Sequence, residues 1–185
     1  WVSSTLMILL SFVISQDSGI LGLVASLIGV TALIICAKGN PSGQILMIIF
    51  CCIYTYISYT CSYYGEMITY ACMSLPMAVF SLVSWLRHPF KGNKTEVKVN
   101  RLKNKEHIFM VLLTIAVTVA FYFILKAFNT ANLIPSTFSV ATSFGAAYLT
   151  FRRNPYYALW YAANDIVLIL LWTLAALKDI SYISV

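Results

Sequence analysis

Apolar segments long enough to cross a membrane follow one another along nearly the whole chain. A helix rises about 1.5 Å per residue, so about 20 residues span the roughly 30 Å hydrocarbon core of a bilayer. Of the 185 residues, 61% are hydrophobic and only 10% are charged, whereas a soluble domain carries about 25% charged residues. A soluble chain of this length could not hide so much apolar surface. The sequence therefore predicts an all-α integral membrane protein.

Seven segments are predicted as membrane spans, the first of them shorter than the requirement. They are residues 1–15, 19–37, 43–63, 66–85, 108–127, 133–151 and 156–177. The chain begins at Trp1 without an initiator Met and ends at Val185, both within apolar sequence. We therefore expect that residues are missing at both ends and that the first span is shortened. The stretch from Ile180 is a candidate for one extra span.

The basic residues lie in alternate connections. The connections after the second, fourth and sixth segments hold ten of the 12 Lys and Arg residues, namely Lys38, Arg87, Lys91, Lys94, Lys98, Arg101, Lys103, Lys105, Arg152 and Arg153. Cytoplasmic loops carry the excess of Lys and Arg, so we expect a cytoplasmic N-terminus and a cytoplasmic loop 87–107. We interpret residues 1–185 as one transmembrane domain. Residues 1–86 hold the first helices and first bundle, 87–107 form the basic loop, and 108–185 hold the second-half helices.

Several functions are disfavoured by what the sequence lacks. The net charge of +6 comes without a basic stripe interleaved with aromatic residues, so no nucleic-acid partner is indicated. The five cysteines lie in apolar runs without metal-ligand spacing. A P-loop and an H-E-x-x-H motif are absent, and both His residues lie in the loop 87–107. We therefore expect no enzyme, no metal and no cofactor.

An Asn-Pro pair occurs twice in matching surroundings. Asn40–Pro41 and Asn154–Pro155 each follow a span that ends in Lys or Arg, and each opens the next span. Proline is tolerated in the first helical turn. Four spans separate the two pairs, so the two units would run parallel. Parallel repeats are a transporter architecture, with substrate held near the midplane between the halves.

The seventh segment combines polar and aromatic residues on one predicted helical face. This face holds Tyr157, Trp160, Tyr161, Asn164, Asp165 and Leu168. A charged side chain at the bilayer centre costs at least ~2.5–3.5 kcal/mol, so Asp165 is a functional candidate that should face a bundle interior or a watered cavity. The alternative is a structural role, with Asp165 hydrogen-bonded to a neighbouring span. Asn164 is the better candidate for ligand contact, because an amide donates and accepts hydrogen bonds without a charge.

Four residues of the first half are further candidates. Gln44 lies near the cytoplasmic end of the third segment, and Tyr56 and Tyr59 lie deeper in it. The sequence leaves open whether these two tyrosines face a substrate cavity. Pro76 falls in the middle of the fourth segment, where it removes a backbone hydrogen bond and predicts a kink.

These residues resemble a known family. Tyr157-x-x-Trp160-x-x-x-Asn164 is similar to the WxxWxxxN signature of the bacterial nicotinamide riboside transporters, the PnuC family. The stretches NLIPSTFSVATSFGAAYLTFRR and YGEMITYACMSLPMAVFSLVSW also look like that family, and the resemblance extends from about Asn40 to Trp172. Two departures are visible: Tyr157 replaces the first Trp of the signature, and Ala78 stands where a polar residue is expected.

The resemblance implies a fold and a mechanism. The fold would be a seven-helix 3+1+3 core of two parallel three-helix bundles joined by a linking helix, as in the SWEET proteins, with an extra helix. The protein would be a homotrimer in the bacterial inner membrane. It would carry nicotinamide riboside by facilitated diffusion, and a cytoplasmic kinase would trap the substrate by phosphorylation.

The residues alone leave rival functions open. A paralogous carrier for another vitamin, such as thiamine or riboflavin, would use the same fold. A non-transporting membrane assembly subunit would need a seam of small residues, for which 19–22 and 139–143 are weak candidates. Coupling to a proton or ion is also open, although a single intramembrane carboxylate gives it little support.

Overall fold

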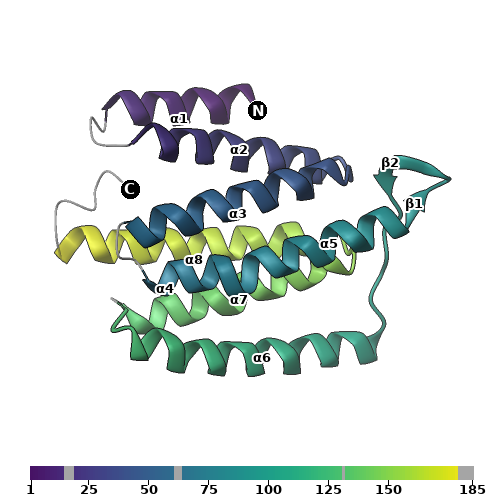
Figure 1. The fold of residues 1–185 in the computed structure, drawn as a ribbon. Helices are drawn as coiled ribbons and strands as arrows, with labels where there is room; N and C mark the ends of the chain where they lie inside the picture. The colour runs from purple at the N-terminus through teal and green to yellow at the C-terminus, as the bar shows by residue number, and fades with distance from the viewer. Residues whose placement is uncertain (15–18, 61–63, 131, 179–185) are drawn as a thin grey trace. The chain divides into compact units, whose positions relative to one another are not determined.

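The computed structural model describes residues 1–14, 19–60, 64–130 and 132–178 (Figure 1). The helices are α1 (Val2–Ile14), α2 (Ile20–Ala37), α3 (Ser42–Thr60), α4 (Tyr64–Ile68), α5 (Leu75–Arg87), α6 (Asn104–Ala127), α7 (Leu133–Phe151) and α8 (Tyr157–Lys178). A π-helical segment, η1 (Thr69–Ser74), joins α4 to α5 without a break. Each of the seven predicted segments is therefore helical over most of its described residues. The candidate extra span from Ile180 lies outside the described residues.

Four of these helical segments are long and apolar enough to cross a membrane: Ile20–Ala37, Ser42–Thr60, Tyr64–Arg87 and Asn104–Ala127. Val2–Val13 and Tyr157–Leu170 are apolar but shorter. Helix α7 is long enough, with 19 residues, but several of them carry hydroxyl groups. These hydroxyls give α7 polar groups that can bond to its neighbours.

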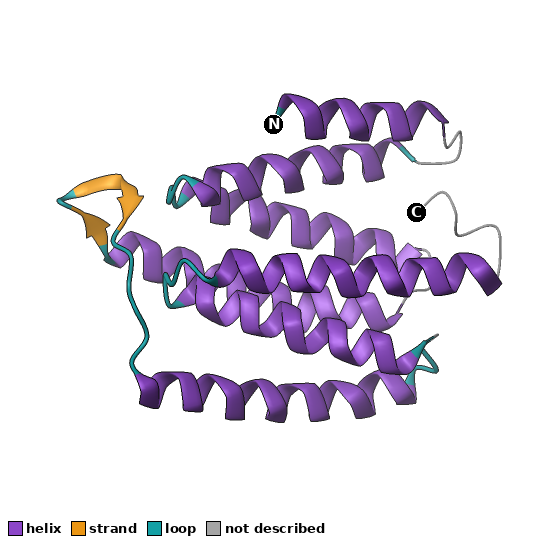
Figure 2. Cartoon of the chain, turned by 180° about the vertical axis from the view of Figure 1, so that it is seen from behind, coloured by secondary structure: helices purple, strands orange, loops and turns teal. Residues whose placement is uncertain are grey.

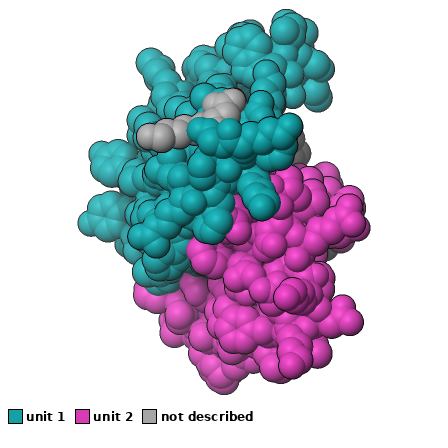
Figure 3. All heavy atoms as spheres, turned by 90° about the vertical axis from the view of Figure 1, so that its right-hand side faces the viewer, with its two compact units in different colours: residues 1–98, 184 teal, residues 99–183, 185 magenta. Residues whose placement is uncertain are grey.

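The chain divides into two compact units, residues 1–98 and 99–183 (Figure 3). The boundary falls within the basic loop 87–107. Unit 1 contains α1 to α5, and unit 2 contains α6 to α8. We describe each unit by itself.

Helices α2 and α3 of unit 1 are in close contact where α3 begins. Gly43 is buried there, and a Cβ at this position would lie 2.6 Å from Cys36 Sγ, 2.7 Å from the Cys36 nitrogen and 2.8 Å from the Ala32 carbonyl oxygen. Two of these three neighbours are backbone atoms, which cannot move aside easily. Glycine is therefore what allows the two helices to approach so closely.

The fourth span changes its hydrogen bonding just before Pro76. Proline has no N–H to donate to the carbonyl of Cys72, four residues earlier. In η1 the helix is wound more loosely, and the Leu75 N–H donates to the Tyr70 carbonyl, five residues back. The Leu75 N–H thus finds a partner inside the helix, as a bilayer requires.

Helix α7 is the central element of unit 2 and packs against both α6 and α8. Its buried side chains include Phe144, Ala146 and Leu149. At one end, the Lys103 N–H donates to Glu106 Oε2 over 3.0 Å. This bond extends α6 to Asn104, four residues before the start predicted from hydrophobicity. Glu106 also forms an ion pair with Arg152, which directly follows α7.

The turn from α2 to α3 closes in a compact hydrogen-bonded loop. The Gly39 N–H donates to the Cys36 carbonyl (2.8 Å), and the Asn40 N–H donates to the Ile35 carbonyl (3.2 Å). Gly39 has a φ of 73°, in the left-handed region. These are the features of a Schellman motif. The Asn40 Oδ1 then accepts the Ser42 N–H at 2.9 Å and starts the next helix.

The turn from α7 to α8 repeats these bonds. The Arg153 N–H donates to the Thr150 carbonyl (2.9 Å), and the Asn154 N–H donates to the Leu149 carbonyl (2.9 Å). Arg153 has a φ of 58°. The Asn154 Oδ1 accepts the Tyr156 N–H at 3.0 Å. Each bond has its counterpart at the same sequence offset in unit 1, so the two Asn-Pro pairs are one local structure used twice.

The connection that follows α5 also contacts both turns, each within its own unit. The Val97 N–H donates to the Gly39 carbonyl (2.9 Å) in unit 1, and the Asn100 N–H donates to the Arg153 carbonyl (3.0 Å) in unit 2. Gly39 and Arg153 are equivalent residues of the two turns. The backbone carbonyls of these two equivalent residues therefore each bind the connection, one within each unit.

A β-hairpin lies in the loop 87–107, which the sequence analysis took for an irregular connector. Strands β1 (Pro89–Phe90) and β2 (Asn93–Val97) pair in an antiparallel sheet (Figure 2). Lys91 and Gly92 have φ values of 48° and 80°, as a two-residue hairpin turn with two left-handed residues requires. The hairpin is an addition to the predicted all-α fold, whose membrane segments are helical. The glycine at position 92 is the sequence signal for its turn.

The close contact at Gly43 yields a stability prediction. Gly43→Ala should lower the thermal midpoint of detergent-solubilised protein by several degrees, because its Cβ overlaps backbone atoms and overpacking costs ~1–3 kcal/mol. Gly22→Ala is the matched control, since a Cβ at Gly22 meets nothing within 4 Å. It should leave the midpoint unchanged or raise it slightly. Equal midpoints for the two variants would contradict the role of Gly43.

Candidate functional site

Asn164 is the polar centre of the contact between α7 and α8. It is buried, with 8% of its surface exposed. Its Oδ1 accepts hydrogen bonds from Ser139 Oγ at 3.0 Å and Thr142 Oγ1 at 2.8 Å. An amide oxygen has two lone pairs, so both are used. Asn164 lies about 10 Å along α8 from Tyr157, well inside the span.

The Asn164 amide lies with its Oδ1 toward the two hydroxyls. Ser139 Oγ has Asn164 Oδ1 as its hydrogen-bond acceptor. Thr142 Oγ1 also lies near the carbonyls of Phe138 and Ser139 and donates to one acceptor at a time, because a hydroxyl carries one hydrogen. With Oδ1 held by donors, the NH₂ group points the other way. Among the described residues this NH₂ group has no hydrogen-bond partner, so it remains available as a donor.

Trp160 packs one turn before Asn164 against the same neighbour. A Cβ added at Gly145 of α7 would overlap the indole ring of Trp160. The ring therefore rests directly on the α7 backbone, while Trp160 as a whole is only half-buried. Gly145 is for this reason part of the site, because any side chain there would displace the indole.

Tyr157 and Asp165 are less enclosed. Tyr157 is half-buried, and its ring lies 6.3 Å from that of Tyr161 at an interplanar angle of 78°. Asp165 is exposed, as are Ile166 and Ile169. The predicted polar face of α8 is thus divided in two: Trp160 and Asn164 contact α7, whereas Asp165 projects away from that contact.

The first-half candidates lie in different surroundings. Gln44 is buried, and its Nε2 donates to Cys36 Sγ at 3.3 Å in the contact between α2 and α3. Tyr56 and Tyr59 are 60% and 62% exposed. They lie away from the buried residues of α3, which include Cys51 and Ser58. Tyr56 and Tyr59 are neighbours on the surface of α3, whereas Gln44 is buried near the start of the same helix, apart from both tyrosines.

Sequence reasoning missed the residues of α7 that complete the site. The candidate seam of small residues, 139–143, named Ser139 but gave no role to Thr142 and did not include Gly145. The usable signal was the spacing of hydroxyl residues at 139 and 142, which places both on one helical face toward a neighbouring span. An aromatic cluster in unit 1 was also missed. Rings of Phe50 and Tyr54 lie 5.3 Å apart, and those of Tyr54 and Tyr70 lie 4.6 Å apart.

Metal ligands do not gather in the part of the chain that the structure describes, where no group of three His, Cys, Asp or Glu side chains could hold an ion. The site therefore consists of an oriented amide, an indole, nearby phenol rings and one carboxylate. Such a set can bind a flat, polar or cationic ring by stacking and hydrogen bonding.

Two known proteins that this chain resembles are named as transporters. A curated relative from Neisseria mucosa, named nicotinamide riboside transporter PnuC, is 28% identical over 172 residues, which cover 91% of this chain and 65% of the relative. The chain thus spans slightly less than two thirds of that relative's length. A solved structure titled "Crystal structure of the Vitamin B3 transporter PnuC" matches with a TM-score of 0.79 and 24% identity. That match covers 99% of this chain and 82% of the solved one, and it confirms the fold.

A family model assigns the chain to a protein family. The model described as "Nicotinamide mononucleotide transporter" matches residues 19–184. This match includes both Asn-Pro turns and the whole α7–α8 site. The family and the relatives above are transporters rather than enzymes. The chain belongs to the nicotinamide mononucleotide transporter family, and its expected resemblance to PnuC is confirmed.

Proposed function

We propose that this chain carries nicotinamide riboside across the bacterial inner membrane. The observation that carries this proposal is the Asn164 amide, which two hydroxyls of α7 orient next to the Trp160 indole. The name of the Neisseria relative supports the choice of substrate. Nicotinamide riboside has a cationic aromatic ring, a carboxamide and ribose hydroxyls, and the site offers a partner for each.

The chemistry of each contact follows from the geometry. The free NH₂ of Asn164 donates to the carboxamide oxygen or to a ribose hydroxyl. Trp160 and Tyr157 attract the cationic ring, an interaction worth ~0.5–2 kcal/mol depending on desolvation. Asp165 balances the positive charge at longer range. For unit 1, Gln44, Tyr56 and Tyr59 stay proposed ligand contacts of that unit, and the exposed tyrosines can reach a ligand more easily than the buried Gln44.

The family name raises the mononucleotide as a rival substrate, and the charges of the site disfavour it. A phosphate group needs Arg or Lys partners when it leaves water. Helix α7 contains neither residue, and α8 has only Lys178 at its far end. The riboside, which lacks the phosphate, fits this site better. Among the other vitamins, thiamine is a stronger rival than riboflavin, because thiamine also carries a cationic ring.

We further propose the 3+1+3 arrangement. Helices α1–α3 and α6–α8 are the two bundles, and Tyr64–Arg87 is the linking helix. The repeated Asn-Pro turns support this assignment, because they follow the second helix of each set. Transport would then be facilitated diffusion by alternating access, in a homotrimer, with cytoplasmic phosphorylation trapping the product.

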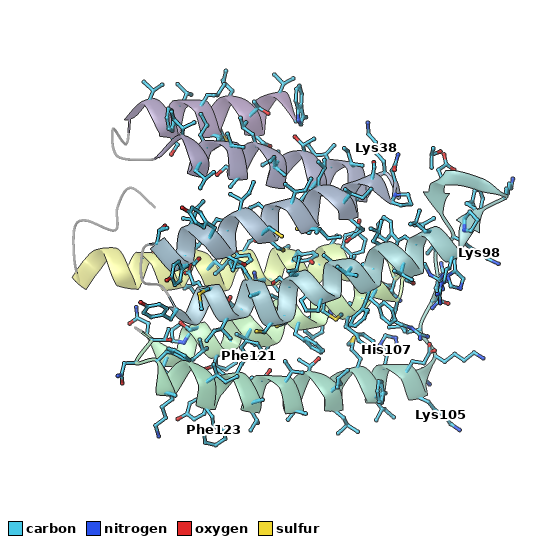
Figure 4. All side chains as sticks on the ribbon, viewed as in Figure 1. Lys38, Lys98, Lys105, His107, Phe121 and Phe123 are labelled. Atoms are coloured by element: carbon cyan, nitrogen blue, oxygen red, sulfur yellow. The ribbon has the colours of Figure 1, made fainter. Side chains whose placement is uncertain are left out.

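The basic ends of the two units support a cytoplasmic orientation for the loop 87–107. In Figure 4, Lys38 and Lys98 lie at one end of unit 1. In unit 2, Lys105 and His107 lie at one end of α6, with Phe121 and Phe123 toward the other. Each unit thus collects basic residues at the end that the positive-inside rule assigns to the cytoplasm.

Calorimetry on detergent-purified protein tests the substrate and the site together. Nicotinamide riboside should bind more tightly than nicotinamide mononucleotide, thiamine or riboflavin. Asn164→Ala and Trp160→Ala should each weaken binding by about five- to thirtyfold, since each removes a contact worth ~1–2 kcal/mol. Ile166→Ala is the control, because Ile166 is exposed away from α7 and should bind as the wild type does. Undiminished binding in both site variants would refute the proposed site, and preference for another vitamin would reassign the substrate.

A second prediction concerns the contact between the Trp160 indole and Gly145. Gly145→Ala should weaken riboside binding at least about fivefold and lower the thermal midpoint, because the new methyl group displaces Trp160. Ser139→Ala should weaken binding less, since Thr142 still holds the Asn164 oxygen. If Gly145→Ala binds the riboside normally, the position of the Trp160 ring does not matter for recognition.

A further inference from the structure

Arg153 occupies a backbone position at which glycine would be unstrained. Its φ is 58°, and the equivalent residue of the first repeat is Gly39, with a φ of 73°. A side chain at left-handed φ is disfavoured by contact between Cβ and the backbone. The second turn nevertheless carries an arginine. Strain of this kind is a reason to look for a use of the side chain.

The guanidinium of Arg153 lacks the partners that its burial requires. Its Nε and Nη1 atoms are buried and have no hydrogen-bond partner among the described residues. Leaving such donors unsatisfied is costly. The nearest carboxylate along this end, Glu106, pairs with Arg152 instead. Burial also lowers the pKa of Arg153 from its ordinary value, as expected for a cation without a neighbouring anion.

The surroundings of Arg153 in unit 2 are strongly basic. The bond from the Asn100 N–H to the Arg153 carbonyl holds the segment before α6 beside this turn. Exposed basic residues follow Asn100 in that segment: Arg101, Lys103 and Lys105. With Glu106 engaged by Arg152, the positive charge of this end is not neutralised by the described residues of the unit.

We propose that Arg153 anchors a binding site for a phosphate group at the basic end of unit 2. A guanidinium matches phosphate oxygens with two parallel N–H donors, and the nearby lysines and Arg101 add attraction at longer range. Two sources supply this chemistry: the phosphodiester of an anionic phospholipid at the membrane surface, and a free phosphate group in solution. This site is separate from Asn164 and Trp160 and does not depend on the proposed substrate.

The test compares three variants with the wild type. Arg153→Gln removes the charge, and Arg153→Gly also removes the strain. Lys126→Gln is the control, because it removes one exposed charge at the other end of α6. Thermal midpoints are measured in neutral detergent with added phosphatidylglycerol against phosphatidylcholine, and with inorganic phosphate against chloride at equal ionic strength. Bound lipid is counted by native mass spectrometry.

The expected result is a ligand-dependent rise of about 5 °C or more at saturation in the wild type and in Lys126→Gln. Both Arg153 variants should lose this rise, and Arg153→Gly should be at least as stable as the wild type without ligand. A response to phosphatidylglycerol alone identifies a lipid headgroup as the occupant, and a response to inorganic phosphate identifies a soluble phosphate. Equal responses in the wild type and both Arg153 variants, or no response to either probe, would overturn the proposal.

Discussion

A polar side chain inside a bilayer must find hydrogen-bond partners within the protein, and this constraint shapes unit 2. Asn164 finds two hydroxyl donors on α7. The hydroxyl residues that serve it make α7 the least lipid-like of the long helices, so α7 is suited to lie between α6 and α8 rather than against lipid. Gly145 has no side chain, and this allows the Trp160 indole to contact the α7 backbone. The oriented amide and the indole are therefore consequences of one helix contact.

The two repeats share a turn but differ in what they build on it. Phe50 stands at the same distance after Asn40 as Asn164 does after Asn154. The Phe50 ring lies against Gly29, where a Cβ would be 3.1 Å from it, and it joins an aromatic cluster. The same scaffold thus carries an apolar contact in unit 1 and a polar one in unit 2. The two units thus share the turn structure, while the clearest ligand-binding features lie in unit 2.

Hydrophobic length and charge were enough to predict the seven helical segments, because a bilayer imposes both requirements on every span. They could not predict the hairpin at Lys91 and Gly92, which depends on two left-handed residues and on bonds to distant carbonyls. For the site, helical periodicity placed Trp160 and Asn164 on one face of α8. It could not separate Asp165 from them. The predicted face is broad, and the neighbouring helix α7 covers only the part that holds Trp160 and Asn164. The contributions of α7 required the packing of two helices, which no single-helix pattern contains.

The most direct test of this account is an experimental structure of the protein with nicotinamide riboside bound. The account predicts the ligand beside the α7–α8 contact, with Asn164 Nδ2 about 3 Å from a ligand oxygen and the nicotinamide ring against Trp160. The bonds from Ser139 and Thr142 to Asn164 Oδ1 should persist. A ligand bound elsewhere, with Asn164 still contacting only α7, would contradict the account and leave Asn164 as a helix-packing residue.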